Sequence, residues 1–488
     1  MAESKRFGPS SRIALSEAAA PLDVASPPRS SDGVRRACRA SRQSPPFPRR
    51  ALCLNRLYGA EPERENPNFN PVSSYADILM GARQVLEGNW REGRTADGLE
   101  FGYTCPDAEK YPDQFFWDSC FHALAWSRID PMRAMRELRS LAVAQQPSGL
   151  IGHTTFWNGP ARPSRAFTYN LLHRHAFQTS TIQPPLLGWV WAEIAERTGD
   201  AKFAEEGRVV LERFHAFLDR ERADADGLIG ILQPDESGLD ATPAYDEPLG
   251  WRSHPKVGFL ALRNFNQRRA FDYRRVVADG GFHATDVLVN TGWILGWEGL
   301  ARLGSPGAAE RVEQLTRSLV DRLYDRMAGT FFAEGPTGES LKVSTWAGLA
   351  TLALDRLPAD IGHRIVNEHV LNPACYWLNF PVPSIAACEP TFVPGSDRYL
   401  WIDRYWRGPT WLFSTWFVMR GLQRLGYATE AAHLADRTLA LVRQSGFREY
   451  FNPMTGEGMG ARNFGVSTIA IECAMLAEQA THVRASVA

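Results

Sequence analysis

Helical segments that recur in pairs constrain the fold of this chain more than any other feature of its sequence. Beginning near residue 73, apolar residues follow one another at spacings of three and four, as in Ile78, Ala82, Val85 and Leu86, and this spacing predicts a helix with one buried face. About eleven further windows of this kind follow, with short connections that contain proline or glycine, so we expect antiparallel helix hairpins. These windows cover approximately residues 118–128, 131–146, 182–198, 201–220, 285–303, 307–326, 343–355, 359–370, 408–425, 428–445 and 467–480.

The two helices of a pair differ in character. The first is apolar on most of its surface, as in PPLLGWVWAEIAERTG (184–199), whereas the second is amphipathic, as in AAERVEQLTRSLVDRLYDRM (308–327). Inner helices surrounded by outer ones indicate an all-α, six-fold α/α toroid, or barrel. A solenoid of helix pairs is the main alternative, but it should show a recurring consensus of small residues, and we find none. In a closed barrel the loops that lead into the inner helices gather at one mouth, where a pocket would form.

The first 60 residues have a different composition from the rest. They contain 11 Lys plus Arg, 4 Asp plus Glu, 7 Pro, 9 Ser and no tryptophan. Such a segment is typical of disorder, although a targeting segment or a translation start placed too far upstream would look the same. We therefore predict a disordered basic Arg/Ser/Pro-rich arm over residues 1–72 and an α/α-barrel domain over residues 73–488.

Charge, hydropathy and cysteine content exclude several classes of protein. The net charge of −1 provides no overall field to attract nucleic acid or an anionic membrane, and no window reaches the roughly 18 uncharged apolar residues of a membrane-spanning helix. Seven scattered cysteines without a CxxC pair indicate neither a disulfide framework nor a zinc site. We expect a cytoplasmic protein whose partner is a small molecule, with no nucleic acid and no membrane. A homo-oligomer remains open.

Two clusters of acids lie in loops next to predicted inner helices. The segment from Tyr111 to Ser119 (YPDQFFWDS) combines aromatic residues with carboxylates, a mixture that suits a sugar, because sugars offer both apolar faces and hydroxyl groups. The alternative is that Asp118 only caps a helix. In QPDESGLDATP (233–243), three acids placed close together would raise one another's pKa, which suits a general acid. The alternative there is a solvated acidic turn.

Two later clusters complete the pattern. RYWRGPTW (404–411) sets two arginines among large aromatic residues, which helix initiation at Pro409 does not explain. FREYFNP (447–453), followed by TGEG (455–458), places Glu449 beside aromatic residues, and Glu457 fits a surface turn. No nucleotide, serine-hydrolase or metalloprotease motif is present. His173 and His175 are two residues apart and would point to different faces of a helix, so we predict no metal and no cofactor.

The segments YPDQFFWDSCFH, PDESGLDATP, YWRGPTW and EYFNPMTGEGMG, in this order, resemble the catalytic domain of glycoside hydrolase family 63. The likeness is greatest to the compact bacterial and plant members that hydrolyse mannosylglycerate or glucosylglycerate, and it spans nearly all of residues 73–480. It implies a six-fold α/α barrel and an inverting glycoside hydrolase. Two departures from the family pattern are Ala241-Thr242-Pro243, where the family commonly has Asn-Ser-Pro, and Val466, where an aromatic residue is common.

The resemblance also implies roles for individual residues. Asp240 corresponds to the general acid and Glu449 to the general base. Further positions correspond to the two walls of the sugar pocket, namely Tyr111, Gln114, Trp117 and Asp118 on one side and Tyr405, Arg407 and Trp411 on the other. Inversion requires the two carboxyl groups to lie roughly 6.5 to 9.5 Å apart, against about 5 to 5.5 Å for a retaining pair.

A glycerate leaving group would need a cation, and we expect it to be Arg407, Arg268, Arg269 or Arg274. The chief alternative activity is an α-glucosidase acting on oligosaccharides or trehalose-like disaccharides. Alternatives of another class are a sugar epimerase, for which only His122 lies within a cluster, and a non-catalytic carbohydrate-binding protein on the same barrel.

Overall fold

The computed structural model of the chain describes residues 75–96, 98–157, 159, 178–399 and 402–476. Chain contacts separate Met1–Gly59 from a larger unit, Ala60–Ala488, to which all the described residues belong. The predicted arm, residues 1–72, lies outside the described residues. Within the described part of the chain, no helix has both the length and the apolar character needed to cross a membrane.

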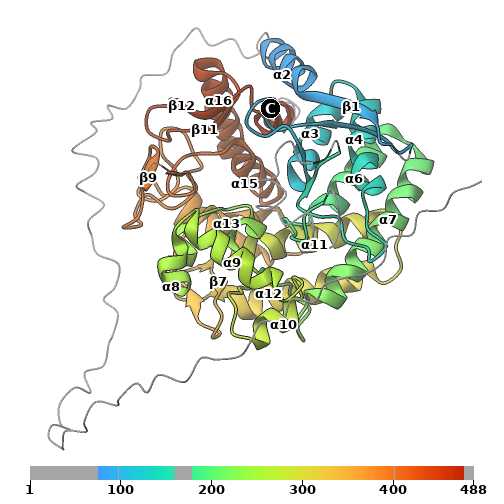
Figure 1. Ribbon diagram of the computed structural model, residues 1–488. Coiled ribbons are helices and arrows are strands. Elements are labelled where there is room, and N and C mark those ends of the chain that lie inside the picture. The colour runs from blue at the N-terminus through green and yellow to red at the C-terminus, as the bar shows by residue number, and fades with distance from the viewer. Residues whose placement is uncertain (1–74, 97, 158, 160–177, 400–401, 477–488) are drawn as a thin grey trace, which may run out of the picture. The chain divides into compact units, whose positions relative to one another are not determined.

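Six apolar helical segments of the larger unit contact one another in chain order. Each segment touches the next, and the last touches the first, so the contacts close into a ring. All the residues of the first segment are buried, as the apolar sequence of an inner helix predicts. Figure 1 shows these segments toward the middle of the unit. They are α3 (Phe116–Ser127), α6 (Leu187–Thr198), α11 (Val287–Arg302), α13 (Trp346–Ala350), α15 (Leu412–Arg424) and η7 (Gly465–Ile469).

Amphipathic helices pack against the outside of this ring. α4 (Pro131–Val143) packs on α3, α7 (Ala201–Glu221) on α6, α12 (Ala308–Leu323) on α11, α16 (Ala428–Ser445) on α15, and α2 (Ala76–Asn89) on η7. α2, α7, α12 and α16 lie farther out in Figure 1. Asp130 and Asp200 accept backbone N–H bonds at the starts of α4 and α7, which places these helix starts where the sequence predicts them. Five of the six inner segments therefore carry an amphipathic outer helix, as the sequence predicts.

The described residues also contain strands that the all-α prediction omits. They form six two-stranded antiparallel sheets in the long loops, where strand pairing satisfies backbone groups that no helix covers. The strands are β1 (Trp90–Arg94), β2 (Glu100–Thr104), β3 (Gln114–Phe115), β4 (Thr154–Thr155), β5 (Tyr324–Asp325), β6 (Thr330–Phe331), β7 (Ala333–Glu334), β8 (Ser340–Leu341), β9 (Asp397–Tyr399), β10 (Ile402–Arg404), β11 (Arg448–Phe451) and β12 (Gly458–Arg462).

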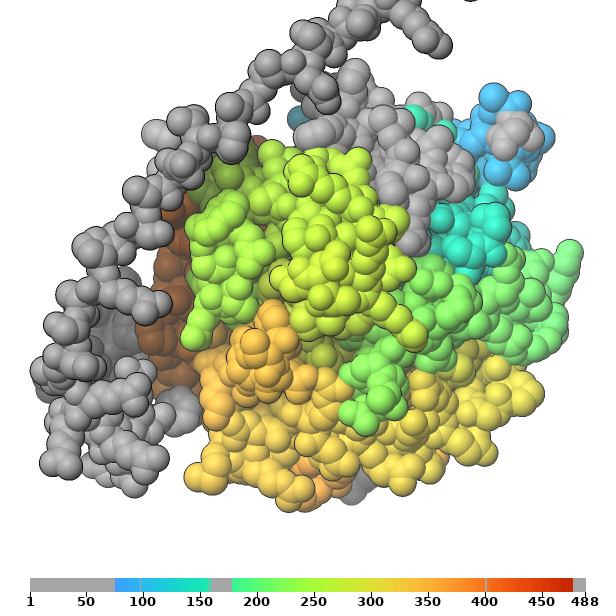
Figure 2. Space-filling view, turned by 60° about the horizontal axis from the view of Figure 1, so that its bottom comes forward, coloured from blue at the N-terminus to red at the C-terminus, as the bar shows by residue number. Residues whose placement is uncertain are grey.

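Short helices fill the remaining connections. Figure 2 shows the yellow-green segment that contains α9 and α10 as a continuous block on one face of the surface. The short helices are η2 (Pro234–Ser237), η3 (Pro243–Tyr245), α8 (Asp246–Leu249), η4 (Gly250–Ser253), α9 (Val257–Gln267), α10 (Tyr273–Ala278), η5 (Thr351–Ala353), α14 (Ala359–Ile365) and η6 (Val366–Val370).

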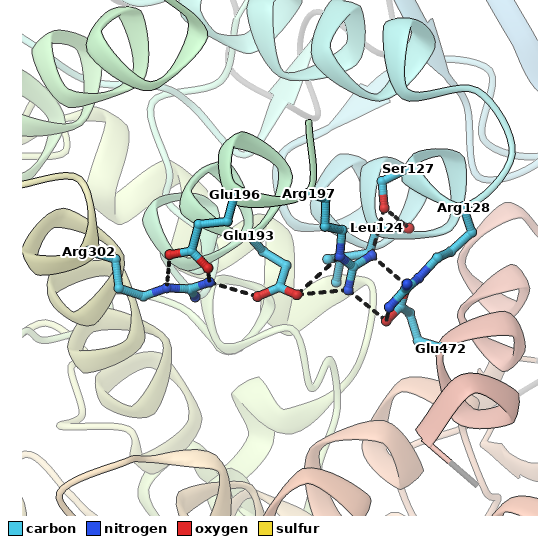
Figure 3. Close-up of polar contacts among 8 residues, drawn as sticks. All are labelled: Leu124, Ser127, Arg128, Glu193, Glu196, Arg197, Arg302 and Glu472. Carbon is cyan, nitrogen blue, oxygen red and sulfur yellow. Dashed lines mark hydrogen bonds and ion pairs between the residues drawn. The ribbon is translucent and has the colours of Figure 1, made fainter. Parts of the chain in front are cut away.

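An ion-pair network ties together the C-terminal ends of inner segments (Figure 3). Arg197, in the last turn of α6, contacts Glu472 at 2.7 Å and Glu193 at 2.9 Å. Arg128, which follows α3, also contacts Glu472 at 2.7 Å, and Arg302 at the end of α11 contacts Glu193 at 2.8 Å. Cations at helix C-termini are electrostatically favourable. The network therefore joins α3, α6, α11 and the helical residues 470–476 at one end of the ring, and the opposite, N-terminal ends are left to form a pocket.

Candidate active site

A pocket lies at the N-terminal ends of the inner segments. Its cavity volume is about 110 Å³. The lining comes from segments that are far apart in the sequence and combines aromatic rings with three carboxyl groups. The lining residues are Pro106, Tyr111, Phe115, Trp117, Asp118, His153, Gln183, Gly238, Asp240, Tyr405, Trp406, Trp411, Phe413, Glu449, Phe464 and Val466.

The start of α3 contributes Trp117 and Asp118. The backbone N–H of Trp117 donates to Oε1 of Gln183 at 3.0 Å, which connects the start of α3 to the residues before α6. Gly238 packs directly against the Trp117 ring: a β-carbon at Gly238 would lie 2.7 Å from the indole, and its φ of +75° favours glycine. Glycine at this position therefore lets the loop that carries Asp240 approach α3.

Burial raises the pKa of Asp118 to about 7. Its side chain lies in the first turn of α3, where its own backbone N–H and the nearby His122 act in the opposite direction, while Asp240 and Glu449 add to the increase. The Asp118 carboxyl group faces the pocket and accepts no N-cap hydrogen bond, so helix capping does not explain why an aspartate occupies this position. A carboxyl group in this position can bind a hydroxyl group of a ligand.

Asp240 follows η2 and is exposed to the pocket, although many protein atoms surround it. This environment raises the pKa of Asp240 to about 6, and the charge of Glu449 contributes to the increase, whereas a hydrogen bond from Tyr405 opposes it. The sequence predicts that unpaired neighbouring acids raise this pKa, but Glu236 is not an unpaired acid. That residue is fully buried and pairs with Arg222 at 2.8 Å, so it supports the loop. Asp240 has the properties of a general acid.

Glu449 is directed into the pocket by a β-bulge. β11 pairs with β12, and the register shifts between Arg448 and Tyr450, so the strand is irregular at Glu449. The Glu449 side chain is 2% exposed. Its Oε1 accepts a hydrogen bond from the Tyr111 hydroxyl at 3.0 Å, and its Oε2 accepts from the Ala461 backbone N–H at 2.7 Å. Burial raises the pKa of Tyr111, which keeps its hydroxyl a donor. The arrangement holds a carboxylate in one orientation.

Large rings form the wall beside these acids. Trp406 and Trp411 stack with centroids 4.2 Å apart and planes 10° apart, and Tyr405 stacks on Tyr450 at 5.5 Å. The stack covers one face of Trp411. The Nε1 of Trp411 is buried and has no hydrogen-bond partner among the described residues. Trp411 can therefore offer a sugar an N–H donor as well as a ring surface.

Two of the predicted pocket residues, Gln114 and Arg407, do not line the pocket. Gln114 is fully buried: it accepts a hydrogen bond from Trp157 Nε1 at 2.7 Å and donates to Ser119 at 3.1 Å, so it has a packing role. Arg407 is 3% exposed and does not line the pocket. It donates to the Ala241 carbonyl at 3.1 Å and pairs with Asp246 at 2.7 Å, which holds the loop after Asp240 in place. The other predicted residues, Tyr111, Trp117, Asp118, Tyr405 and Trp411, line the pocket together with Asp240 and Glu449.

The sequence reasoning did not identify His153 and Gln183 as pocket residues. Both are buried and lie in loops without a distinctive motif, so no local signal marks them. Burial lowers the pKa of His153 to about 3, which keeps the ring neutral. Val466 was noted only as a departure from a family pattern, and it lines the pocket.

The histidine that the epimerase alternative requires, His122, is not part of the pocket lining. His122 is fully buried, lies 3.4 Å from Glu137 and does not line the pocket. Within the described ranges, no group of three His, Cys, Asp or Glu residues is arranged to hold a metal ion. His173 and His175 lie outside the described residues.

Comparison with known proteins agrees with this geometry. Residues 111–467 match a family described as the mannosylglycerate hydrolase MGH1-like glycoside hydrolase domain. A mannosylglycerate hydrolase of Thermus thermophilus is 30% identical over 442 residues, which are 80% of this chain and 98% of that protein. A mannosylglycerate hydrolase of Rubrobacter radiotolerans is 29% identical over 443 residues, with 80% of this chain and 94% of that protein covered.

Solved structures show the same relationship. The crystal structure of a GH63 mannosylglycerate hydrolase from Thermus thermophilus, in complex with Tris and D-glycerate, is similar to this chain with a TM-score of 0.70 and 27% identity. The similarity covers 81% of this chain and 99% of that chain.

A glucosylglycerate hydrolase of Mycolicibacterium hassiacum is 24% identical in sequence over 406 residues, which are 72% of this chain and 89% of that protein.

Proposed function

The chain belongs to the mannosylglycerate hydrolase MGH1-like family of glycoside hydrolases, and from this premise we propose that it hydrolyses the α-glycosidic bond of mannosylglycerate or glucosylglycerate with inversion. The resemblance to glycoside hydrolase family 63 that the four motifs predicted is confirmed, and the chain is a glycoside hydrolase. The substrate, the stereochemistry and the residue roles are the proposal.

One observation carries the proposal: Asp240 and Glu449 line the same pocket although they lie far apart in the chain. The two groups differ in environment. The protein atoms around Asp240 favour its protonated form, whereas donors hold both oxygens of Glu449 in one orientation. Inverting glycoside hydrolysis uses one carboxylic acid as proton donor and a second carboxyl group, in a fixed position, as the base.

The proposed reaction is a single displacement. Asp240 donates its proton to the glycosidic oxygen as the bond to the leaving group breaks. Glu449 takes a proton from a water that attacks the anomeric carbon from the opposite face. Asp118 binds hydroxyl groups of the ring, and Trp117 and Trp411 provide apolar surface and an N–H donor. Asp240 loses one proton and Glu449 gains one, so the number of protons is balanced. Exchange with solvent then returns both residues to their starting protonation states.

The substrate is proposed from the relatives, and the reaction type from the pocket. The sixteen described lining residues include no arginine or lysine, so the proposed clamp on a glycerate carboxylate has no candidate there. Arg269 instead pairs with Asp279 at 2.8 Å, and Arg274 donates to the Arg220 carbonyl at 3.5 Å. The two named glycosides are preferred because relatives over most of the chain carry those names.

The experiment that tests the proposal incubates the purified protein with mannosylglycerate, glucosylglycerate, trehalose and maltose and follows the released anomer by proton NMR. We expect early β-anomer from one of the two α-linked glycerate compounds. Asp240→Asn and Glu449→Gln should each lower kcat by roughly 10²- to 10⁴-fold. Glu457→Gln is the control, since Glu457 is an exposed residue of the turn that follows β11. Early α-anomer would overturn inversion, and preferred cleavage of maltose or trehalose would overturn the substrate.

Several broader predictions are proposals as well. We propose that the closed ring of inner segments, with its outer helices, is a six-fold α/α toroid, supported by the contact order around the ring. We also propose that residues 1–72 form an arm outside a hydrolase domain that spans 73–488. A cytoplasmic location is consistent with the free thiols of the five cysteines among the described residues, two of which, Cys375 and Cys388, have sulfur atoms 3.2 Å apart.

A further inference from the structure

A lysine at the edge of the pocket contacts the carboxylate of Glu449. Lys110 Nζ lies 2.8 Å from Oε2, and the lysine side chain is 47% exposed whereas that of Glu449 is 2% exposed. The same Oε2 accepts the Ala461 N–H, while Oε1 accepts the Tyr111 hydroxyl. An exposed cation therefore compensates the charge of a carboxylate that water barely reaches. Lys110 itself does not line the pocket.

The two carboxylate oxygens of Glu449 differ in the number of hydrogen-bond donors that contact them. A carboxylate oxygen has two lone pairs for hydrogen bonds. Oε2 uses both, for Lys110 and Ala461, whereas Oε1 uses one, for Tyr111. We propose that Lys110 is a positioning residue that saturates Oε2 of Glu449 and leaves Oε1 as the atom that takes the proton from the attacking water. This inference rests on the proposed hydrolysis, and it specifies how the base works.

The loop around Lys110 holds it in this position. The backbone N–H of Lys110 donates to Asp107 Oδ1 at 2.6 Å, and Asp107 forms a β-bridge with Tyr111. The ammonium lies 4.7 Å from the centroid of the Tyr111 ring, so it is attracted to that ring as well. The two side chains that approach Glu449 from this loop therefore stabilise each other, and each occupies a different oxygen.

Other titratable groups also interact electrostatically with Glu449. They are Tyr111, Asp118, Asp240, Arg448 and Tyr450. Arg448 points its guanidinium toward the Gly460 carbonyl, at 3.1 Å, and Asp118 and Asp240 bring charge of the same sign as Glu449. Lys110 is thus the cation that directly opposes these two acids at the carboxylate of Glu449.

The test compares Lys110→Met, which keeps length without charge, with Lys110→Arg, which keeps the charge. For Lys110→Met we expect kcat to fall by roughly 10- to 100-fold, KM to change little, and the acid limb of the pH–rate profile to move to higher pH. Lys110→Arg should restore most of kcat. Lys342→Met is the matched control, because Lys342 pairs with Asp325 at 2.9 Å away from the pocket and is 64% exposed. It should leave kcat, KM and the pH profile unchanged.

A second measurement separates failure of this inference from failure of the proposed function. Infrared difference spectra of the wild type, with Glu449→Gln to identify the band, show the pH at which the Glu449 carboxyl group becomes protonated. In Lys110→Met this pH should be higher than in the wild type, whether or not a glycoside is hydrolysed. An equal pH in both proteins, or a change in KM with kcat unaltered, would overturn the positioning role. Absence of hydrolysis in the wild type, with the infrared shift present, would overturn the proposed function alone.

Discussion

Gly460 stands directly against the carboxylate of Glu449: a β-carbon on Gly460 would lie 2.5 Å from Oε2. β12 therefore approaches Glu449 closely enough for its backbone to hold the side chain, and only glycine leaves room. Gly460 also has a φ of +67°, where any other residue is strained.

We predict that Gly460→Ala displaces the Glu449 carboxylate and lowers kcat by roughly 100-fold. Gly199→Ala is the control, since Gly199 has a φ of +65° in the left-handed region but nothing within 4 Å of an added β-carbon. Both variants should lose about 1 kcal/mol of stability from the strained backbone, measured by denaturant unfolding. Equal kcat values for the two variants would show that the contact with Glu449 has no role.

The pKa of Asp240, about 6 because of burial and the charge of Glu449, predicts an alkaline limb in the pH profile. A general acid must be protonated, so kcat/KM should fall roughly tenfold per pH unit above this value. The measurement is kcat/KM between about pH 5 and about pH 9. A profile that stays flat across this range would exclude Asp240 as the proton donor.

Asp118 makes stability depend on pH. Its pKa in the folded protein, about 7, lies above the usual 3.8, so the folded state binds the proton more tightly than the unfolded state. The stability that this proton contributes is complete below pH 3.8 and is lost as the pH rises to about 7. The loss is on the order of 4 kcal/mol.

We therefore predict that Asp118→Asn, which cannot ionise, raises Tm relative to the wild type above pH 7 and changes it little near pH 4. The same variant should lower kcat/KM, because the carboxyl group faces the pocket. Thermal melts of the two proteins at matched pH values provide the test. A constant difference in Tm at all pH values would contradict the assigned shift.

Ala241, immediately after Asp240, has a φ of +56°, a conformation that costs alanine roughly 1 kcal/mol. Arg407 holds this conformation through the Ala241 carbonyl. We predict that Ala241→Gly raises the free energy of unfolding by about 1 kcal/mol. Ala244→Gly, at a position without a positive φ, should lower it instead. If both glycine variants destabilise the protein equally, the strain at Ala241 is absent in solution.

Glu472 is 3% exposed and accepts from both Arg128 and Arg197. Glu472→Gln removes the anion that Arg128 and Arg197 share and leaves Glu193 as the remaining anion of Arg197, which should cost about 3 kcal/mol of unfolding free energy. Glu205→Gln is the control, because Glu205 pairs with Arg208 on the surface, and its removal should change stability little. Equal effects of the two variants would show that the network in Figure 3 does not hold the ends of the inner helices together.

Short-range patterns were sufficient to predict the helices and the loops that carry the site. Helical spacing depends on neighbours three and four residues apart, so the windows at 118–128 and 201–220 are close to α3 and α7 as observed. Asp118 and Glu449 stood out because acids beside aromatic residues are uncommon in a core, and Asp240 stood out because it shares a short loop with two other acids. Gln114 and Arg407 stood out for the same reason, but they point into packed surroundings. Local sequence does not distinguish the two outcomes, because the direction of a side chain depends on what packs around it.

By itself, the amino-acid sequence determined that this protein is built from paired helices, which of them are buried, and which four loops carry acids and aromatic rings, because these properties depend on residues close together in the chain. Only the tertiary structure decided that Asp240 and Glu449 share one pocket, that Lys110 and Ala461 occupy Oε2 of Glu449, and that His153 belongs to the lining. These relationships arise where segments far apart in the sequence meet around the ring. Local sequence cannot determine them, because burial, hydrogen bonding and charge compensation act between neighbours in space.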